Sequence, residues 1–154
     1  MSESQRVVLA VGLPGAGKST WFAKRGIRPL SSDGMRILLS DDEDNQQIHI
    51  EVFEALRYLL VKRLQIGVRA TYIDATNLTR MHRKPFLALA RQYGALAEAL
   101  WFATPLEVCL ARNAARDRRV PEDVMRAMRE RFEEPSKAEG FARIERVNVR
   151  ERVG

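Results

Sequence analysis

The sequence predicts an α/β fold with three layers, in which a mostly parallel sheet lies between two layers of helices. Short apolar runs that suit buried strands alternate along the chain with stretches whose periodicity suits helices. Such alternation is typical of βαβ units, which build a parallel sheet with helices on both faces. The length of 154 residues is within the usual range for one domain, so we expect a single domain over residues 1–154.

The first expected elements are a strand and a helix joined by a glycine-rich loop. Residues 6–11 form an apolar run that stops at Gly12, which is typical of a buried parallel strand. Residues 18–25 suit a helix that ends at Gly26. A second short strand is expected next. It covers the five residues before Ser32, and a helix then resumes.

That second strand is expected over residues 27–31, with Ser32 and Asp33 at its carboxyl end and the next helix running through residues 35–39. Residues 45–65 form the longest helix candidate. Apolar residues recur there on one face, which predicts that this face belongs to the core. These residues are Ile48, Val52, Leu56, Leu59, Leu60 and Leu64.

The second half of the chain continues the alternation. Residues 68–73 suit a strand that delivers Asp74 to its end, and residues 79–93 suit a helix. Pro85 lies inside that helix pattern, where it either sets the true start of the helix or kinks it. Residues 96–103 suit a further strand.

The last elements begin at prolines. Thr104 and Pro105 are expected to be the cap and first-turn pair of a helix that ends near Asn113. Pro121 is expected to open the next helix, and a final strand is expected over residues 144–149. Ligands of such sheets lie beyond the carboxyl ends of the strands, so the residues that end the strands are the first candidates for a site. These residues are Gly12, Asp33 and Asp74.

A phosphate-binding motif follows the first strand. The string GLPGAGKST matches G-x-x-x-x-G-K-[ST] between an apolar strand and a helix, which predicts the P-loop of a nucleoside triphosphatase fold. Glycines let the backbone amides turn toward phosphate oxygens of ATP or another NTP. Lys18 is expected to reach the β and γ phosphates, and Ser19 to bind Mg²⁺. The expected nucleotide-binding residues of the loop are Gly12, Pro14, Gly15, Ala16, Gly17, Lys18, Ser19 and Thr20.

Two charged residues after the second strand suit phosphoryl transfer to an alcohol. A carboxylate at a strand end that faces the γ phosphate can accept the hydroxyl proton, and Asp33 is placed for this role. The alternative is that Asp33 caps the helix that follows it. Arg36 lies three residues further on, so on a helix it shares the face of Asp33 and could hold an anionic group of the acceptor.

The order P-loop, SSDGMR, DATNL, ARNAARDRRVPEDV and RFEEPSKAEGF resembles the kinase domain of polynucleotide 5′-kinases over nearly the whole chain. The resemblance implies transfer of the γ-phosphate of ATP to the 5′-hydroxyl end of DNA or RNA in nucleic-acid repair. It implies that Asp33 is the general base and that Arg36 grips the phosphate on the 3′ side of the reacting nucleotide. It also implies a helical lid in which Arg112 contacts the nucleotide and Arg116 contacts the transferring phosphoryl group.

The DATNL string leaves several roles open. Asp74 could order the water shell of the metal or hydrogen-bond to the P-loop. Thr76 and Asn77 could line the acceptor groove, and the alternative is that they are turn and cap residues. His49 and His82 are isolated in the sequence, with no metal-ligand spacing around them, so we expect surface or structural roles for both.

The net charge of +6 favours a polyanionic partner, with a solvated basic surface as the alternative. The basic clusters are Arg80, His82, Arg83 and Lys84, and Arg112, Arg116, Arg118 and Arg119. The sequence shows no cationic leader and no apolar run near 18 residues, so we expect no membrane insertion and a cytoplasmic location. The resemblance implies association with a phosphatase, phosphodiesterase or ligase module, and the oligomeric state is left open.

Two other classes of protein share part of this pattern. A P-loop kinase of a small-molecule hydroxyl, such as a sugar acid, an antibiotic or a nucleotide sugar, would have the loop, an aspartate after the second strand and a basic lid. A nucleotide-binding switch would bind ATP without needing Asp33 and a paired lid. Through the resemblance, Arg36 and the string RFEEPSKAEGF favour the polynucleotide kinase over the small-molecule kinase.

Overall fold

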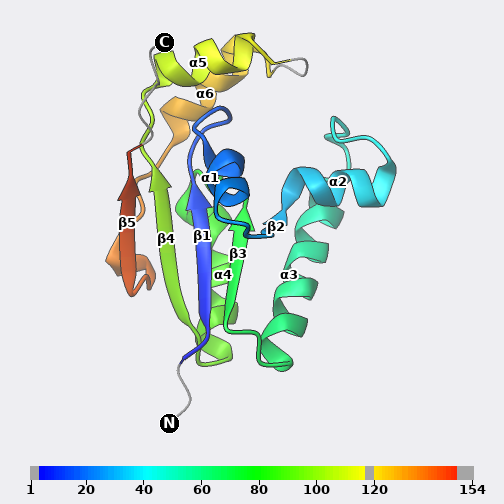
Figure 1. Ribbon diagram of the computed structural model, residues 1–154, viewed down its shortest axis with the longest axis vertical. Helices are drawn as coiled ribbons and strands as arrows, with labels where there is room; N and C mark the ends of the chain where they lie inside the picture. The colour runs from blue at the N-terminus through cyan, green and yellow to red at the C-terminus, as the bar shows by residue number, and fades with distance from the viewer. Residues whose placement is uncertain (1–3, 117–119, 149–154) are drawn as a thin grey trace.

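A five-stranded sheet forms the centre of the protein in the computed structural model, which describes residues 4–116 and 120–148 (Figure 1). The strand order is β2-β3-β1-β4-β5, and every pairing is parallel, as the sequence predicts. The strands are β1 (Arg6–Val11), β2 (Leu30–Ser31), β3 (Ala70–Asp74), β4 (Leu96–Phe102) and β5 (Arg143–Val147).

Helices cover both faces of this sheet. They are α1 (Lys18–Lys24), α2 (Ser32–Ser40), α3 (His49–Gln65), α4 (Arg80–Gln92), α5 (Leu106–Ala114) and α6 (Glu122–Arg131), with a 3-10 turn at Lys137–Glu139. None of these helices is both long and apolar enough to cross a membrane.

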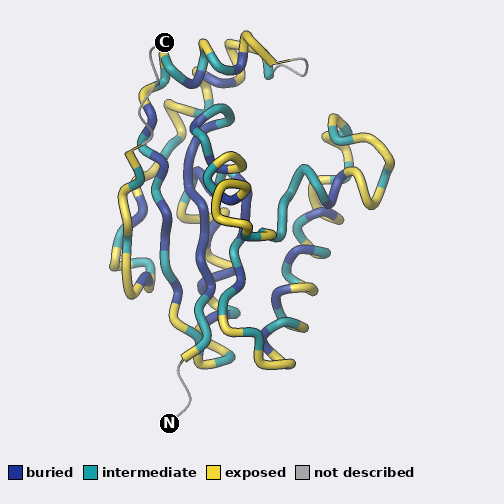
Figure 2. The backbone as a smooth tube through the Cα atoms, viewed as in Figure 1, coloured by how far each residue is buried: buried dark blue, intermediate teal, exposed yellow. Residues whose placement is uncertain are grey.

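Strand β1 divides the core into two clusters, because successive side chains of a strand point to opposite faces. Its Val7, Leu9 and Val11 pack with α3 and α4, whereas Val8 and Ala10 pack with α1, α5 and α6. Figure 2 shows β1 buried over most of its length between the other elements. The expected three-layer arrangement is therefore confirmed.

Strand β2 is shorter than predicted. It covers only Leu30–Ser31, whereas the sequence predicts residues 27–31. Pro29 has no amide hydrogen and cannot donate to a strand ladder, which accounts for the late start. The Ser31 side chain then accepts a hydrogen bond from the Gly34 amide at 3.1 Å, so α2 begins directly after the strand.

Helix α3 begins later than predicted, at His49 rather than residue 45. The Asp42 carboxylate accepts from the Asp44 amide, and the Asn45 side chain accepts from the Gln47 amide. These side-chain bonds offer the backbone an alternative to helix, so the segment before His49 forms turns. On α3 the predicted apolar face is buried except at Leu59, which is 36% exposed.

Helix α4 contains Pro85 within its length. The helix begins at Arg80, where the Thr79 hydroxyl caps it by accepting from the His82 amide at 3.2 Å, and it continues to Gln92. The sequence left open whether Pro85 sets the start of the helix or kinks it. Pro85 does not set the start, because the helix begins five residues earlier.

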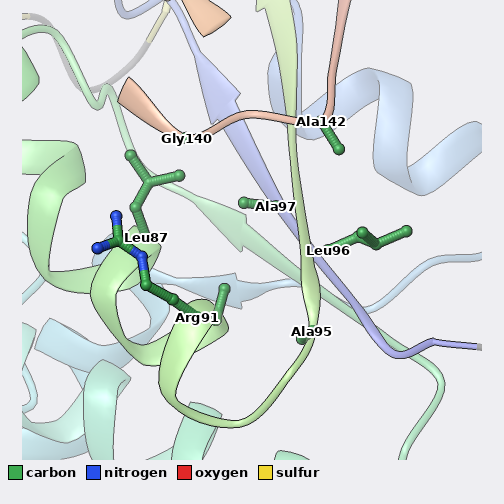
Figure 3. A pocket seen from close by; sticks show the side chains of 8 residues that line it. Leu87, Arg91, Ala95, Leu96, Ala97, Gly140 and Ala142 are labelled. Atoms are coloured by element: carbon green, nitrogen blue, oxygen red, sulfur yellow. The ribbon is translucent and has the colours of Figure 1, made fainter. Parts of the chain in front are cut away.

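A pocket of about 150 Å³ lies at the amino end of β4, between this strand and α4 (Figure 3). Its lining is mainly aliphatic, with Arg91 as the one ionisable residue among the lining residues. A P-loop follows the opposite, carboxyl end of a strand, so this pocket lies at the wrong edge of the sheet for the predicted chemistry.

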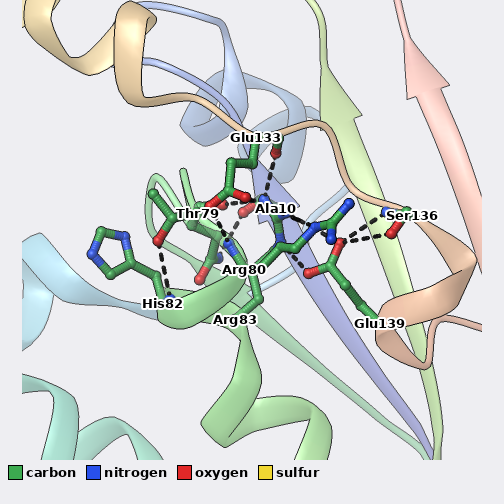
Figure 4. A network of polar contacts seen from close by, with 9 residues as sticks. Ala10, Thr79, Arg80, His82, Arg83, Glu133, Ser136 and Glu139 are labelled. Atoms are coloured by element: carbon green, nitrogen blue, oxygen red, sulfur yellow. Dashed lines mark hydrogen bonds and ion pairs between the residues drawn. The ribbon is translucent and has the colours of Figure 1, made fainter.

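A buried arginine ties the last third of the chain to α4. The Arg83 side chain is completely buried; it forms an ion pair with Glu139 at 2.8 Å and donates to the carbonyls of Asn77 and Glu133 (Figure 4). Arg83 was expected in a basic surface cluster, and this expectation is wrong. The string RFEEPSKAEGF contributes Glu133, Ser136 and Glu139 to this network, so these residues have a structural role that does not distinguish between acceptors.

Candidate active site

The P-loop connects β1 to α1 at the carboxyl edge of the sheet. The Gly12 amide donates to the Thr76 carbonyl at 3.0 Å, which joins the loop to the end of β3. Gly15 has a φ of +81°, and a Cβ atom there would lie 2.8 Å from the Cys109 carbonyl oxygen, so the loop and α5 are in close contact at this position. Only glycine adopts this positive φ without strain and has no Cβ atom to clash with Cys109.

Lys18 lies inside the loop. Its ammonium donates to the carbonyls of Gly12 at 2.6 Å and Leu13 at 2.9 Å. Burial lowers the pKa of Lys18 to about 8, while the negative charges of Asp74 and Asp33 oppose this shift and the positive charge of Arg116 adds to it. The predicted phosphate-binding, base and lid residues therefore act on one another electrostatically, although they come from four separate segments of the chain.

Ser19 and Asp74 form the second polar contact of the site. The Ser19 hydroxyl donates to Asp74 Oδ2 at 3.0 Å, so Asp74 hydrogen-bonds to the P-loop, one of its two expected roles. Burial raises the pKa of Asp74, against the opposing effects of Lys18 and Ser19. A hydroxyl beside a carboxylate fits Mg²⁺, which takes few protein ligands and completes its shell with water and phosphate oxygens. Asp74 thus lies on the nucleotide side of the site, beside Ser19 of the P-loop.

Asp33 is not the cap of the helix that follows it. Ser31 is the N-cap of α2, and Asp33 is in the first turn with its side chain 50% exposed. Its charge acts on both Lys18 and Asp74, which places the carboxylate beside the P-loop. The capping alternative is therefore wrong, and the side chain is accessible to an acceptor.

Arg36 is buried beside this carboxylate. Its Nη1 donates to Asp33 Oδ1 at 3.4 Å, and its Nη2 lies 3.4 Å from His49 Nδ1. Both contacts are at the long limit for hydrogen bonds, and the buried Arg36 Nε has no hydrogen-bond partner among the described residues. The guanidinium therefore has unused bonding capacity next to the candidate base. The contact of His49 with Arg36 cannot be predicted from the sequence, because it depends on how α2 and α3 pack.

Thr76 and Asn77 have mainly structural contacts. The Thr76 carbonyl accepts from the P-loop Gly12 amide. Asn77 is 2% exposed, has a φ of +47° and donates from its side chain to the Ala10 carbonyl at 2.7 Å. An acceptor cannot reach so buried a side chain, so the expectation that Asn77 lines an acceptor groove is wrong. The turn-residue alternative describes its conformation.

Two hydrogen bonds join the P-loop to α5 and to the segment just before it. The buried Thr104 hydroxyl, which precedes α5, donates to the Ala16 carbonyl at 2.8 Å, so it does not cap the helix as predicted. Arg112 Nη1 donates to the Gly15 carbonyl at 3.3 Å, which places this arginine at the nucleotide loop.

Arg116 lies beyond the end of α5. The helix stops at Ala114, so only Arg112 of the two expected lid arginines lies on it. The Asn113 side chain donates to the carbonyl of Val120 and accepts from its amide, so Val120 lies beside the end of α5. The charge of Arg116 nevertheless acts on Lys18. Arg118 and Arg119 of the same predicted cluster lie outside the described residues.

A family model described as an AAA domain (AAA_33) matches residues 7–135. The chain belongs to this AAA domain family. The match begins in β1 and ends after α6, so it includes the P-loop, Asp33, Arg36 and the lid arginines. The AAA domain described here has an α/β P-loop kinase fold.

Similar proteins include kinases with different acceptors. An L-seryl-tRNA(Sec) kinase of Methanococcus maripaludis is 25% identical over an alignment of 137 residues, which covers 84% of this chain and 53% of that protein. The AAA domain chain thus spans about half the length of this curated relative. A chain of the Pnkp1/Rnl/Hen1 RNA repair complex has a TM-score of 0.67 at 19% identity, covering 86% of this chain and 48% of that chain. A gluconokinase from Sinorhizobium meliloti has a TM-score of 0.63 at 16% identity, covering 98% and 86%. The two structural likenesses show the fold alone.

Proposed function

We propose that this AAA domain transfers the γ-phosphate of ATP to a hydroxyl group, and that the hydroxyl is the 5′ end of a polynucleotide. The observation that carries the proposal is the pair of Asp33 and Arg36 beside the P-loop. The pair combines an accessible carboxylate with a buried cation whose hydrogen bonds are incomplete. A hydroxyl next to a phosphate is an acceptor that uses both groups at once.

The proposed reaction is a direct transfer. The acceptor oxygen forms a bond to the γ phosphorus, the bond from this phosphorus to the β–γ bridging oxygen breaks, and the proton of the acceptor hydroxyl moves to Asp33. Lys18 and Arg116 balance negative charge on the phosphates as it shifts toward the leaving ADP. Bound Mg²⁺ would supply further positive charge to the phosphates of the nucleotide, with Ser19 and Asp74 as the residues that would hold it.

Asp33→Ala is expected to lower the rate of transfer by at least about 10²-fold, because a general base contributes about this much to the chemical step. The affinity for ATP should stay close to that of the wild type, since the carboxylate acts on the acceptor. Single-turnover transfer of the labelled phosphate and calorimetric titration with ATP measure the two quantities. Asp123→Ala, at an exposed aspartate in the first turn of α6, is the matched control. Loss of ATP binding in Asp33→Ala would show that the carboxylate serves the nucleotide and not the acceptor.

Arg36→Ala is expected to lower kcat/KM about tenfold to a hundredfold for acceptors with a phosphate on the 3′ side of the reacting nucleotide, because a hydrogen bond to a charged group contributes about 1.5–3 kcal/mol. The acceptors to compare are a 5′-hydroxyl oligonucleotide, a nucleoside 3′-monophosphate and the plain nucleoside. The substitution should affect the first two alike and leave any reaction of the nucleoside nearly unchanged.

An oligonucleotide with a neutral methylphosphonate at its first linkage sharpens this test. It keeps the shape of the polynucleotide and removes only the charge that Arg36 is proposed to bind. The wild type should therefore use it about as poorly as Arg36→Ala uses the natural oligonucleotide. Equal wild-type activity on the nucleoside and on its 3′-monophosphate would rule out the phosphate clamp.

A small-molecule hydroxyl is the second candidate acceptor, and one observation favours it. The acidic segment at residues 41–44 follows α2 directly, and the Ser40 hydroxyl bonds to both Arg36 and Asp42 carbonyls. Negative charge close to the acceptor side repels a long polyanion and leaves a short neutral acceptor unaffected. Sugars, sugar acids and nucleosides therefore belong in the same assay, and strong activity on an acceptor without any phosphate would favour this candidate.

A further inference from the structure

His49 and Arg36 meet in an arrangement that determines which ring nitrogen carries the proton. Arg36 Nη2 can only donate, so the Nδ1 atom that lies 3.4 Å away must accept. This requires a neutral imidazole with its proton on Nε2. The His49 ring is also packed on Phe53, with 4.6 Å between the ring centroids, which limits its rotation.

We propose that His49 is a positioning residue for Arg36, and that it holds the guanidinium toward the acceptor only while its imidazole is neutral. The inference rests on the proposed role of Arg36 as the residue that binds an anionic group of the acceptor. Asp33 holds one end of the guanidinium through Nη1, and His49 holds the other through Nη2. Without the second contact, the buried side chain has a single long bond to fix its direction.

The surroundings of His49 favour its neutral form. Burial lowers the pKa of His49 below its ordinary value, and the charges of Arg36 on α2 and His82 on α4 lower it further. Asp33 pairs with Arg36 rather than with the imidazole. The histidine is therefore neutral at pH 7, and acid converts its Nδ1 from an acceptor for Arg36 into a second cation beside it. The contact is present above the depressed pKa and is lost as the pH falls through it.

Three variants separate this role from a merely structural one. His49→Ala removes the acceptor, and His49→Asn keeps an oxygen near the position of Nδ1 that acid does not protonate. With a 5′-hydroxyl oligonucleotide at pH 7.5, His49→Ala should lose about tenfold in kcat/KM, and His49→Asn should retain most of the activity. His82→Ala is the control, because His82 lies on α4 and the charges that act on its imidazole are those of Arg131, Arg83 and Glu133 rather than that of Arg36. It should behave as the wild type does.

The pH profile gives the second readout. As the pH falls through the depressed pKa of His49, the wild type should lose activity relative to His49→Asn, and the ratio of the two kcat/KM values should change by about tenfold across this transition. The oligonucleotide is the right acceptor for this comparison, because its phosphodiesters do not titrate in this range. A ratio that is constant with pH would overturn the proposal.

A measurement without any substrate keeps the inference independent of the proposed function. The chain has 2 histidines, so the imidazole signals in an NMR titration are assigned by comparing the wild type with His82→Ala. Arg36→Met removes the positive charge at similar side-chain length, and it should raise the pKa of His49 while leaving that of His82 nearly unchanged. An unchanged pKa of His49 would overturn the inference. A raised pKa together with inactivity on every polynucleotide would support the contact and contradict the proposed acceptor.

Discussion

Lys18→Ala is expected to lower phosphoryl transfer by about 10³-fold or more, the largest effect that the structure predicts. The ammonium is enclosed by the P-loop, where it donates to the Gly12 and Leu13 carbonyls. When the phosphates of a nucleotide bind in the loop, the Lys18 ammonium can exchange these neutral carbonyl oxygens for charged phosphate oxygens. Charged oxygens bind a cation more strongly. Steady-state transfer from labelled ATP measures the loss.

Lys24→Ala is the matched control, because it removes a lysine from the last turn of the same helix, α1. Lys18→Met tests whether the loss comes from charge rather than from packing. Near-normal turnover in either Lys18 variant, with normal turnover in the control, would show that the loop does not bind the reacting phosphates.

The stability of Lys18→Met gives an independent check on the environment of this lysine. The pKa of Lys18 falls from an ordinary value of 10.5 to about 8 in the fold, so the folded state disfavours the charged form. Unfolding then takes up protons between these two pH values, and this contribution to stability rises with pH in that window. Below pH 8 the full cost of burying the charge is present, and methionine removes it. The unliganded variant should therefore unfold at the wild-type temperature or above it at pH 7.

Arg116→Ala is expected to lower kcat by about 10³-fold, at the lower end of the range for arginines that contact a transferring phosphoryl group. Its charge acts on Lys18, so the two cations lie within electrostatic reach of the same phosphates. Negative charge spreads over the phosphoryl oxygens in the transition state, and a contact that strengthens there lowers kcat when it is removed. The KM for ATP should rise much less.

Arg126→Ala is the control for this lid prediction. Arg126 is an exposed arginine of α6 that pairs with Glu122, so its removal changes the net charge of the protein by the same amount without affecting the P-loop. Initial rates over a range of ATP concentrations separate kcat from KM for both variants. An unchanged kcat in Arg116→Ala would contradict the role of this arginine. A raised KM with unchanged kcat would instead assign Arg116 to nucleotide binding.

The sequence by itself determined the parts of this protein that depend on residues close together in the chain. The strand, glycine loop and helix of the P-loop span residues 6–24, and local preference decides where each begins and ends. Alternating apolar runs likewise predicted the parallel sheet and its two helical layers. Pro121 set the start of α6 in the same local way.

Only the tertiary structure decided what the charged and polar residues do, because their partners are far away in the sequence. Asp33 lost its capping alternative once Ser31 was found to cap α2, and Arg36 was found to contact His49 of another helix. Arg83 could not be distinguished from a surface arginine until Glu139, 56 residues later, was found beside it. Burying a charged or polar group is favourable only when other residues form hydrogen bonds or ion pairs with it. These partners lie far away in the sequence, so a pattern with a period of a few residues does not reveal them.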